Sequence, residues 1–180
     1  MHPPFVLALF LIVSLSSYGS ASAQPSDTVP PNLAVPSGNF TAFGVWADGV
    51  QIYACQAMAD NPSAFEWAFR FPEATLMSLD GEVIGKHYAG PSWEGLDGSV
   101  VVGAARANAD SPDPSAIPWL LLEAQSNSGT GLFSTVSYVQ RLDTSGGRAP
   151  SEGCGASTVG QEARVPYTAI YTFSYPVASS

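Results

Sequence analysis

The side chains best suited to chemistry gather in one short stretch, residues 86–99, which reads KHYAGPSWEGLDGS. An indole ring can stack on a flat ligand, and carboxylates accept hydrogen bonds from hydroxyl groups, so this stretch has the composition of a small-ligand or carbohydrate site. The candidate ligand-binding residues are His87, Tyr88, Trp93, Glu94 and Asp97. The alternative is a connection between strands in which Trp93 packs into the core and His87 is a hydrogen-bonded structural residue.

Catalytic chemistry has little support in the sequence. His87 is the only histidine after residue 2, so a zinc or copper site lacks imidazole ligands. The G-x-S-x-G motif of serine hydrolases and the G-x-G-x-x-G motif of dinucleotide-binding enzymes are both missing. We therefore expect no catalytic residue, no metal and no cofactor. A glycosidase-like pair of carboxylates stays open, because sequence does not fix the distance between two carboxyl groups.

Two functional classes follow from these residues. The leading hypothesis is a non-enzymatic binding or surface-associated domain for a small ligand or carbohydrate. The alternative is an extracellular hydrolase that acts on carbohydrate with carboxylates near His87. An enzyme predicts that His87 or a carboxylate pair is exposed in a pocket with a perturbed pKa, whereas a binding or structural protein predicts a buried His87 and Trp93 in the core.

The elements that must position these residues are β-strands. In the run 65–71, FEWAFRF, alternation places Phe65, Trp67, Phe69 and Phe71 on one face. In the run 165–175, the same period places Tyr167, Ala169, Tyr171, Phe173 and Tyr175 on one face.

Turn signals separate the remaining apolar runs. Runs 75–79 and 82–88 flank Asp80-Gly81, a strong hairpin signal. Runs 99–106 and 132–142 are interpreted as further strands. The Pro-containing run 117–124 is ambiguous, although its length favours a buried strand with Pro118 at its start. No window keeps a helical period for three turns. We therefore predict an all-β fold, either a two-layer antiparallel β-sandwich or a closed β-barrel of about eight strands.

The N-terminus is typical of a signal peptide. An apolar run, Phe5 to Leu15, is followed by Ala21-Ser22-Ala23, which fits a cleavage site. The run is too short for a membrane span, which needs about twenty residues. We predict a signal peptide over 1–23, a Pro-rich lead-in over 24–41 and one all-β domain over 42–180, secreted to the periplasm or outside the cell.

The expected secretion predicts the state of the two cysteines, and the net charge limits the possible partners. In an oxidising compartment Cys55 and Cys154 are most simply interpreted as a disulfide, and a metal pair is the poorer alternative.

Fifteen acidic residues against six basic ones give a net charge of −9, which argues against nucleic acid and anionic membranes as partners. Asn39-Phe40-Thr41 is an N-glycosylation sequon, which matters if the source is eukaryotic.

Several longer motifs occur in a fixed order along the chain. They are G-V-Q-I-Y-x-C (49–55), H-x-A-G-P-x-W (87–93), D-G-S (97–99), I-P-W-L-L-L (117–122), Q-R-x-x-T-x-G-G-x-A-P (140–150) and V-P-Y-x-A-x-Y-x-F (165–173). Together the motifs resemble the secreted family called domain of unknown function three-four-five-five, over residues 31–176. The resemblance implies that the cysteines and residues 87–99 belong to a shared design. Some members carry a malate dehydrogenase label, which this sequence does not support because the dinucleotide motif and any α/β pattern are missing.

Overall fold

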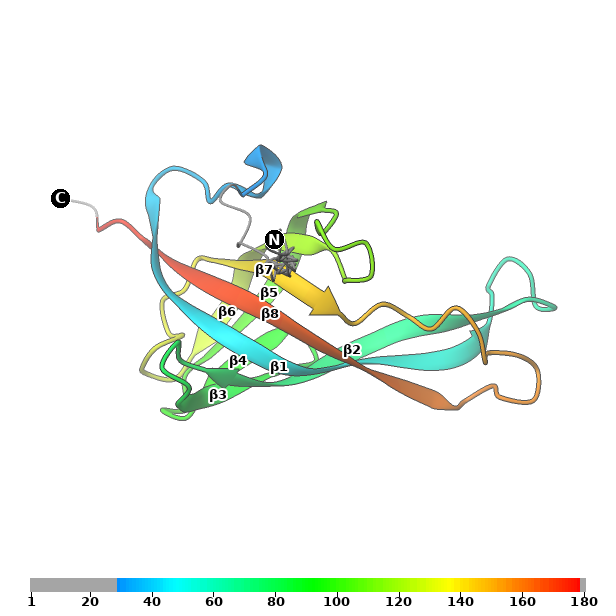
Figure 1. Cartoon of the computed structure of the whole chain (residues 1–180). Helices are drawn as coiled ribbons and strands as arrows, with labels where there is room; N and C mark the ends of the chain where they lie inside the picture. Colours follow the sequence, from blue (N-terminus) through cyan, green and yellow to red (C-terminus); the bar gives the residue numbers. More distant parts are fainter. Residues whose placement is uncertain (1–28, 179–180) are drawn as a thin grey trace, which may run out of the picture.

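The computed structural model describes residues 29–178, which form an all-β structure (Figure 1). A short 3-10 helix, η1 (Pro31–Leu33), precedes eight strands. The strands are β1 (Asn39–Ala57), β2 (Phe65–Met77), β3 (Val83–Tyr88), β4 (Ser92–Gly95), β5 (Val100–Ala109), β6 (Trp119–Ser128), β7 (Tyr138–Gly146) and β8 (Glu162–Pro176). The predicted fold class and the predicted number of strands are confirmed.

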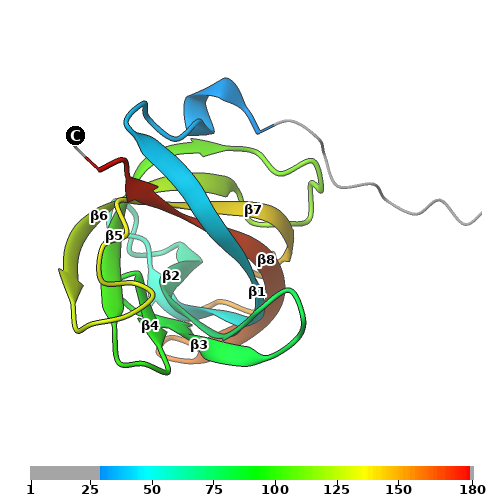
Figure 2. The ribbon, with the colours of Figure 1, turned by 90° about the vertical axis from the view of Figure 1, so that its left-hand side faces the viewer.

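The sheet closes on itself. Each strand pairs antiparallel with its neighbour in sequence, and β8 returns to pair with β1, which makes a closed barrel (Figure 2). The β1–β8 register runs from Asn39 opposite Pro176 to Ala54 opposite Glu162. Of the two architectures that the sequence left open, the structure is therefore the barrel, in which closure removes the unpaired edges of the closed part.

The barrel interior is filled by every second residue of its strands. On β8 the inward face carries Tyr167, Ala169, Tyr171 and Phe173, as the alternation predicts, and all four are buried. The buried residues that pack with them come from most of the other strands and include Val45, Ala47, Leu76, Trp93, Val101, Leu122 and Val139. This apolar interior is the main core of the protein.

One end of the barrel is plugged by the segment that precedes β7. The run 132–142 was expected to be one strand, but β7 begins only at Tyr138. Residues 132–135 form a turn, 136–137 are irregular, and this segment carries Phe133 and Val136 into the core. The ring of Phe133 lies 4.8 Å from that of Phe173, measured between centroids. The apolar side chains of this segment thus reflect a plug and not a strand.

A bulge in β2 makes the prediction that its aromatic residues all share one face wrong. Ile52 pairs with Phe71, but the next residue, Tyr53, pairs with Phe69, so Arg70 is an extra residue in β2. The bulge places Phe69 and Phe71 on opposite faces of the sheet, although strict alternation predicts one face. The Phe69 ring lies 5.7 Å from that of Tyr53 and its side chain is 54% exposed.

The Pro-rich lead-in contributes to the fold. Leu33 of η1 is buried on the outside of the barrel, in a second cluster with Trp119, Leu121 and Leu142. β1 begins at Asn39, inside the predicted lead-in, and the Asn39 side chain is hydrogen-bonded to Pro36 O and Ser137 Oγ. The predicted signal peptide, residues 1–23, lies outside the described residues.

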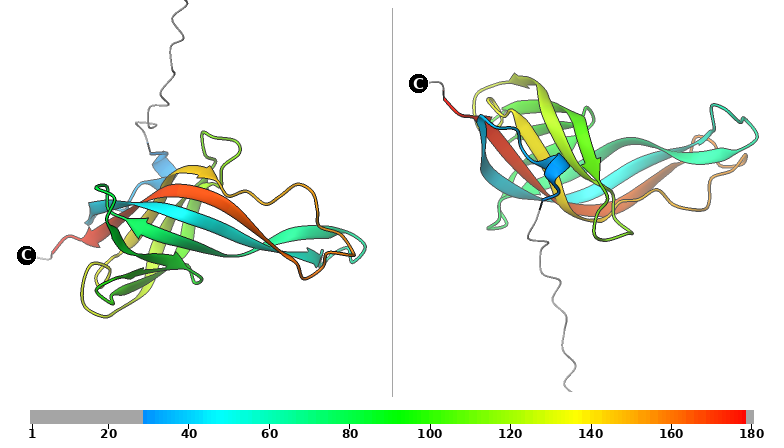
Figure 3. Two further views of the ribbon diagram at one scale, coloured as in Figure 1. Left: turned by 60° about the horizontal axis from the view of Figure 1, so that its bottom comes forward. Right: turned by 90° about the horizontal axis from the view of Figure 1, so that it is seen from above.

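Three strands continue beyond the barrel as an arm. β3 pairs with β2 only over Ala74–Met77, and β7 pairs with β8 only from Tyr167 onward. The distal parts of β1, β2 and β8 (residues 50–57, 65–73 and 162–166) therefore project as a three-stranded arm, seen in Figures 1 and 3. A methyl group at Gly49, where the arm leaves the barrel, would collide with Glu73 O, so β1 and β2 cross closely there.

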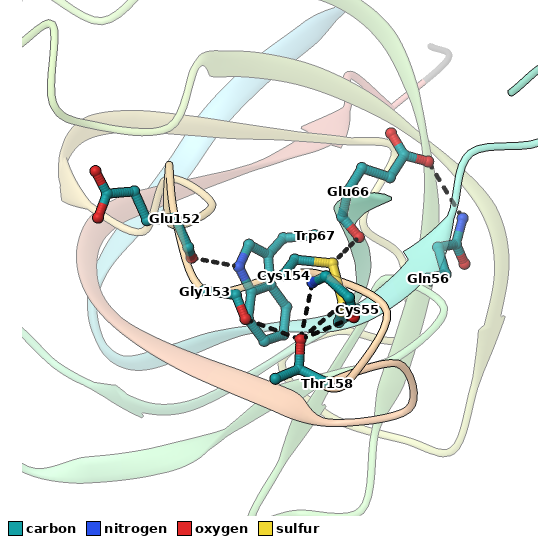
Figure 4. The surroundings of a disulfide bond; sticks show 9 residues. Cys55, Gln56, Glu66, Trp67, Glu152, Gly153, Cys154 and Thr158 are labelled. Carbon is teal, nitrogen blue, oxygen red and sulfur yellow. Dashed lines mark hydrogen bonds between the residues drawn. A yellow bond between two sulfur atoms is a disulfide. The ribbon is translucent and has the colours of Figure 1, made fainter. Parts of the chain in front are cut away.

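A disulfide pins the connection between β7 and β8 onto this arm. Cys55 and Cys154 are bonded, with their Cα atoms 5.3 Å apart and a sequence separation of 99 positions, so the predicted pairing is confirmed (Figure 4). Trp67 Nε1 donates a hydrogen bond to Glu152 O beside it, at 2.8 Å. Thr158 Oγ1 accepts from Gly155 N, which shapes the turn that follows the cysteine.

Candidate functional site

Strand alternation separates the candidate ligand-binding residues into two groups. The stretch expected to be a connection forms a tight hairpin, in which His87 of β3 pairs with Trp93 of β4 and Lys86 pairs with Glu94. Paired residues share a face of a sheet, so His87 and Trp93 point into the barrel while Lys86, Tyr88 and Glu94 point outward. The structure therefore brings together His87 with Trp93, and Tyr88 with Glu94, but not the two pairs.

The inward pair is the centre of an aromatic cluster. The rings of His87 and Trp93 stack at 4.5 Å with an interplanar angle of 12°. Tyr171 of β8 lies against both, with centroid distances of 5.0 Å to His87 and 5.4 Å to Trp93. Gly103 of β5 makes room for the indole, since a Cβ there would lie 3.2 Å from the six-membered ring of Trp93. The cluster holds these rings in one fixed arrangement.

His87 is a neutral imidazole in this setting. It is 3% exposed, and burial lowers its pKa to about 3. Its hydrogen bond to Ser92 O opposes that shift and the positive charge of Arg141 adds to it. Because a carbonyl oxygen only accepts, Nδ1 carries the proton and donates to Ser92 O at 2.8 Å. His87 is thus both a structural residue and part of the inward-facing surface.

The outward pair belongs to a network of surface charges. Tyr88 Oη donates to Glu94 Oε2 at 2.8 Å, and Lys86 Nζ lies 3.2 Å from the same oxygen. These hydrogen bonds lower the pKa of Glu94, and the bond from Tyr88 raises the pKa of that phenol. A shallow groove of about 770 Å³ runs past them on the outer face, where Arg164 pairs with Glu73. Most of the charges in the groove are thus neutralised by each other.

Asp97 holds the plug of the barrel in place. Its Oδ1 accepts from both the backbone N and the Oγ of Ser99, and its Oδ2 accepts from Leu132 N at 2.7 Å. Ser99 Oγ in turn accepts from Phe133 N at 2.9 Å. The hydrogen bonds lower the pKa of Asp97 and keep it ionised. Asp97 therefore ties the segment before β7 to the β4–β5 turn, away from the aromatic cluster.

A cavity of about 210 Å³ lies beside the His87–Trp93 stack. Its floor is buried and mainly aromatic, formed by Pro72, His87, Trp93, Leu122 and Tyr171. Its rim is more exposed, formed by Phe69, Pro91, Ala105, Leu120 and Arg141. Phe69 belongs to the arm, so the cavity opens on the side from which the arm projects. A pocket with buried apolar walls and few polar groups is the usual form of a small-ligand site, which favours this cavity over the larger outer groove.

Arg141 is the one charged side chain that lines this cavity. On β7 it lies two residues after Val139, whose side chain is in the core, so both side chains are on the inward face of the strand. Arg141 pairs with Leu120 on one side and Tyr171 on the other. Its Nε and Nη2 both donate to Pro118 O, at 3.1 and 2.8 Å. The sequence analysis does not single out Arg141. The available signal was the alternation of residues 138–142, which places Arg141 on the same face as the apolar residue Val139.

The site offers stacking surfaces and one positive charge. His87 and Glu94 lie on opposite faces of the sheet, so the carboxylate does not reach the imidazole through the barrel wall. Over residues 29–178, no group of three or more His, Cys, Asp or Glu side chains is placed to hold a metal ion. No helix in that same range combines the length and apolar composition that crossing a bilayer requires.

Comparison with known proteins gives a family and no function. A family model described as Protein of unknown function (DUF3455) matches residues 36–175. No curated protein and no solved structure matches the chain. The match spans the whole barrel, the arm and both cysteines, and it confirms the resemblance that the motifs indicate. The chain is a member of the DUF3455 family.

Proposed function

We propose that this protein is a secreted, non-enzymatic binding protein that takes up one small molecule in the barrel cavity. The observation that carries the proposal is the cavity of about 210 Å³, with the stacked rings of His87 and Trp93 in its floor and Arg141 at its rim. For comparison, an engineered apolar cavity of about 150 Å³ is large enough to bind benzene. The cavity is therefore of a size for a single ring with a small substituent.

The walls of the cavity are held by contacts within the protein itself. His87 is fixed by its bond to Ser92 O and by stacking, and Trp93 is completely buried among Tyr171 and Phe173. A preformed site loses little side-chain entropy on binding, which favours affinity. The apolar floor supports a ligand with a hydrophobic body over a carbohydrate, because a sugar needs many hydrogen-bond partners.

Secretion is part of the proposal. The disulfide between Cys55 and Cys154 supports it, since such bonds persist in oxidising compartments. The apolar run and small residues of the N-terminus support it as well. Tagging the full-length chain at its C-terminus and comparing the mass of the exported and internal forms tests this part; an uncut tagged protein retained in the cytoplasm would contradict it.

Binding is tested by filling the cavity. Ala105 lies at the rim, whereas its neighbour Ala104 pairs with Glu123 and faces outward, so the two positions make a matched pair. We expect single-ring aromatic probes to raise the melting temperature and quench Trp93 fluorescence in the unaltered protein and in Ala104→Phe, and to lose both effects in Ala105→Phe. Equal binding by the two variants would place the site elsewhere, and no response to any single-ring probe would overturn the proposal.

A further inference from the structure

The cavity has an unbalanced charge. Arg141 is its one charged lining residue, because His87 is neutral at ordinary pH. Over residues 29–178, the guanidinium of Arg141 has no carboxylate within 4.0 Å; the ion pairs of that range are Lys86–Glu94, Arg106–Glu123 and Arg164–Glu73. The chain has 15 acidic residues against six basic ones, so the lack of an ion pair at Arg141 is not explained by a shortage of carboxylates.

The positive charge is directed at the interior. Burial raises the pKa values of Tyr53, Tyr167 and Tyr171, and the charge of Arg141 opposes the rise in each. Tyr53 lies on β1 in the arm, and Tyr167 and Tyr171 lie on the inward face of β8, so the charge of Arg141 acts on phenols of both the arm and the barrel interior. His87 faces the cavity from β3, and the charge of Arg141 lowers its pKa further.

Hydrogen-bond donors also outnumber their partners around the cavity. A guanidinium has five N–H groups; Arg141 uses two of them on Pro118 O, and a further interaction with the Tyr171 hydroxyl opposes the rise in the pKa of that phenol. The indole N–H of Trp93 is fully buried and has no acceptor among the described residues. Buried donors without acceptors are costly, so a site built this way gains from a ligand that brings acceptor atoms.

We infer that the ligand is a small aromatic monocarboxylate, with its ring against the His87–Trp93–Tyr171 surface and its carboxylate on Arg141. The inference rests on the proposed function, because it names the class of molecule for the same cavity. Arg141 lies next to Tyr171 across the β7–β8 register, and Tyr171 contacts the stack, so the charge and the stacking surface line the same cavity side by side. Two parallel N–H···O bonds from an arginine to a carboxylate give both strength and orientation.

The test compares ligands on the unaltered protein and needs no variant. Benzoate carries ring and charge, benzamide carries the ring without the charge, and acetate carries the charge without the ring. By calorimetry we expect benzoate to bind roughly 10- to 100-fold more tightly than benzamide, the factor that a charge-assisted hydrogen bond supplies. Acetate and inorganic phosphate should show no saturable binding.

Variants then assign the preference to Arg141. Arg141→Met should reduce the benzoate-to-benzamide ratio to about one, and Arg141→Lys should keep part of it. The matched control is Arg106→Met, because Arg106 pairs with Glu123 on the outer face of the same barrel and should leave the ratio unchanged. Circular dichroism of each variant verifies folding.

Each outcome separates this inference from the proposed function. If benzamide and benzoate bind equally and Ala105→Phe abolishes both, the cavity is a ligand site but the carboxylate assignment is wrong. A benzoate preference that survives in folded Arg141→Met overturns the assignment as well, and so does phosphate binding that is tighter than benzoate binding. If neither ring compound binds, the proposed function itself fails.

Discussion

Trp93 allows the sharpest test of the packing, because the structure gives its surroundings completely. The side chain is 0% exposed and contacts three aromatic rings, those of His87, Tyr171 and Phe173. Replacing a buried Trp by Ala costs about 3–5 kcal/mol through lost burial and the cavity left behind. Each aromatic pair adds about 0.5–1.5 kcal/mol beyond its buried area, so Trp93→Ala should fall at the upper end of that range.

The assay is urea unfolding followed by far-UV circular dichroism with the disulfide intact. For a domain of this size the expected loss corresponds to a fall in melting temperature of roughly 6–20 °C. Trp93→Phe should cost clearly less, because a ring remains against His87. The control is Trp46→Ala, since Trp46 faces outward on β1 and is 37% exposed.

The reasoning fails if Trp93→Ala lowers the free energy of unfolding by less than about 1 kcal/mol, the typical cost of an average substitution. It also fails if Trp46→Ala proves as damaging as Trp93→Ala. A cost confined to ligand affinity, with stability unchanged, would mean that the indole lies in the site without supporting the core.

Three other predictions concern the disulfide, pH and the plug. Replacing both Cys55 and Cys154 by Ser should lower stability by up to about 4–5 kcal/mol in the chain-entropy model, and titration of the unfolded, unreduced parent should find no free thiol. The folded pKa of His87, about 3, is below its ordinary value of 6.5, so stability is full above pH 6.5 and declines as pH falls toward 3, by about 1.4 kcal/mol per pH unit. His87→Gln should remove that slope between pH 6.5 and 5, and an unchanged slope would contradict the assignment. Asp97→Ala should speed hydrogen exchange at the Leu132 amide, whose bond to the carboxylate is lost; equal protection would refute the anchoring role.

The parts of the fold that the sequence predicts are those set by local pattern. The alternation of residues 165–175 correctly gives the inward face of β8, because each residue of a strand points opposite to its neighbours. The Asp80-Gly81 turn is also correct, with Gly81 at φ +87°. These signals need no knowledge of which strands pair.

The parts that the sequence did not predict depend on pairing partners. Arg70 is an extra residue only when β2 is compared with its partner β1. The sequence FEWAFRF alone therefore does not indicate that Phe71 lies on the opposite face from Phe69. Residues 132–137 are apolar enough to be predicted as a strand. They form a plug instead, because Phe133 and Val136 are buried against the apolar core at the end of the barrel. β4 is only four residues long, and the sequence predicts a connection there instead of a strand. Without that strand, alternation could not show that His87 and Trp93 face inward while Tyr88 and Glu94 face outward.

Closure of the barrel by its first and last strands also sets the order in which the protein can fold. β1 can pair with β2 at once, but its second partner, β8, comes last in the chain, so the ring closes by joining segments more than a hundred residues apart. Cys55 sits near the end of β1 and Cys154 precedes β8 by a single turn-rich segment. Oxidation of this pair fastens those two strand ends together and removes most of the loop-closure entropy that opposes their pairing. The arm that carries the bond is thus a folding clamp: once it is joined, the β1–β8 seam can close from the disulfide toward the barrel.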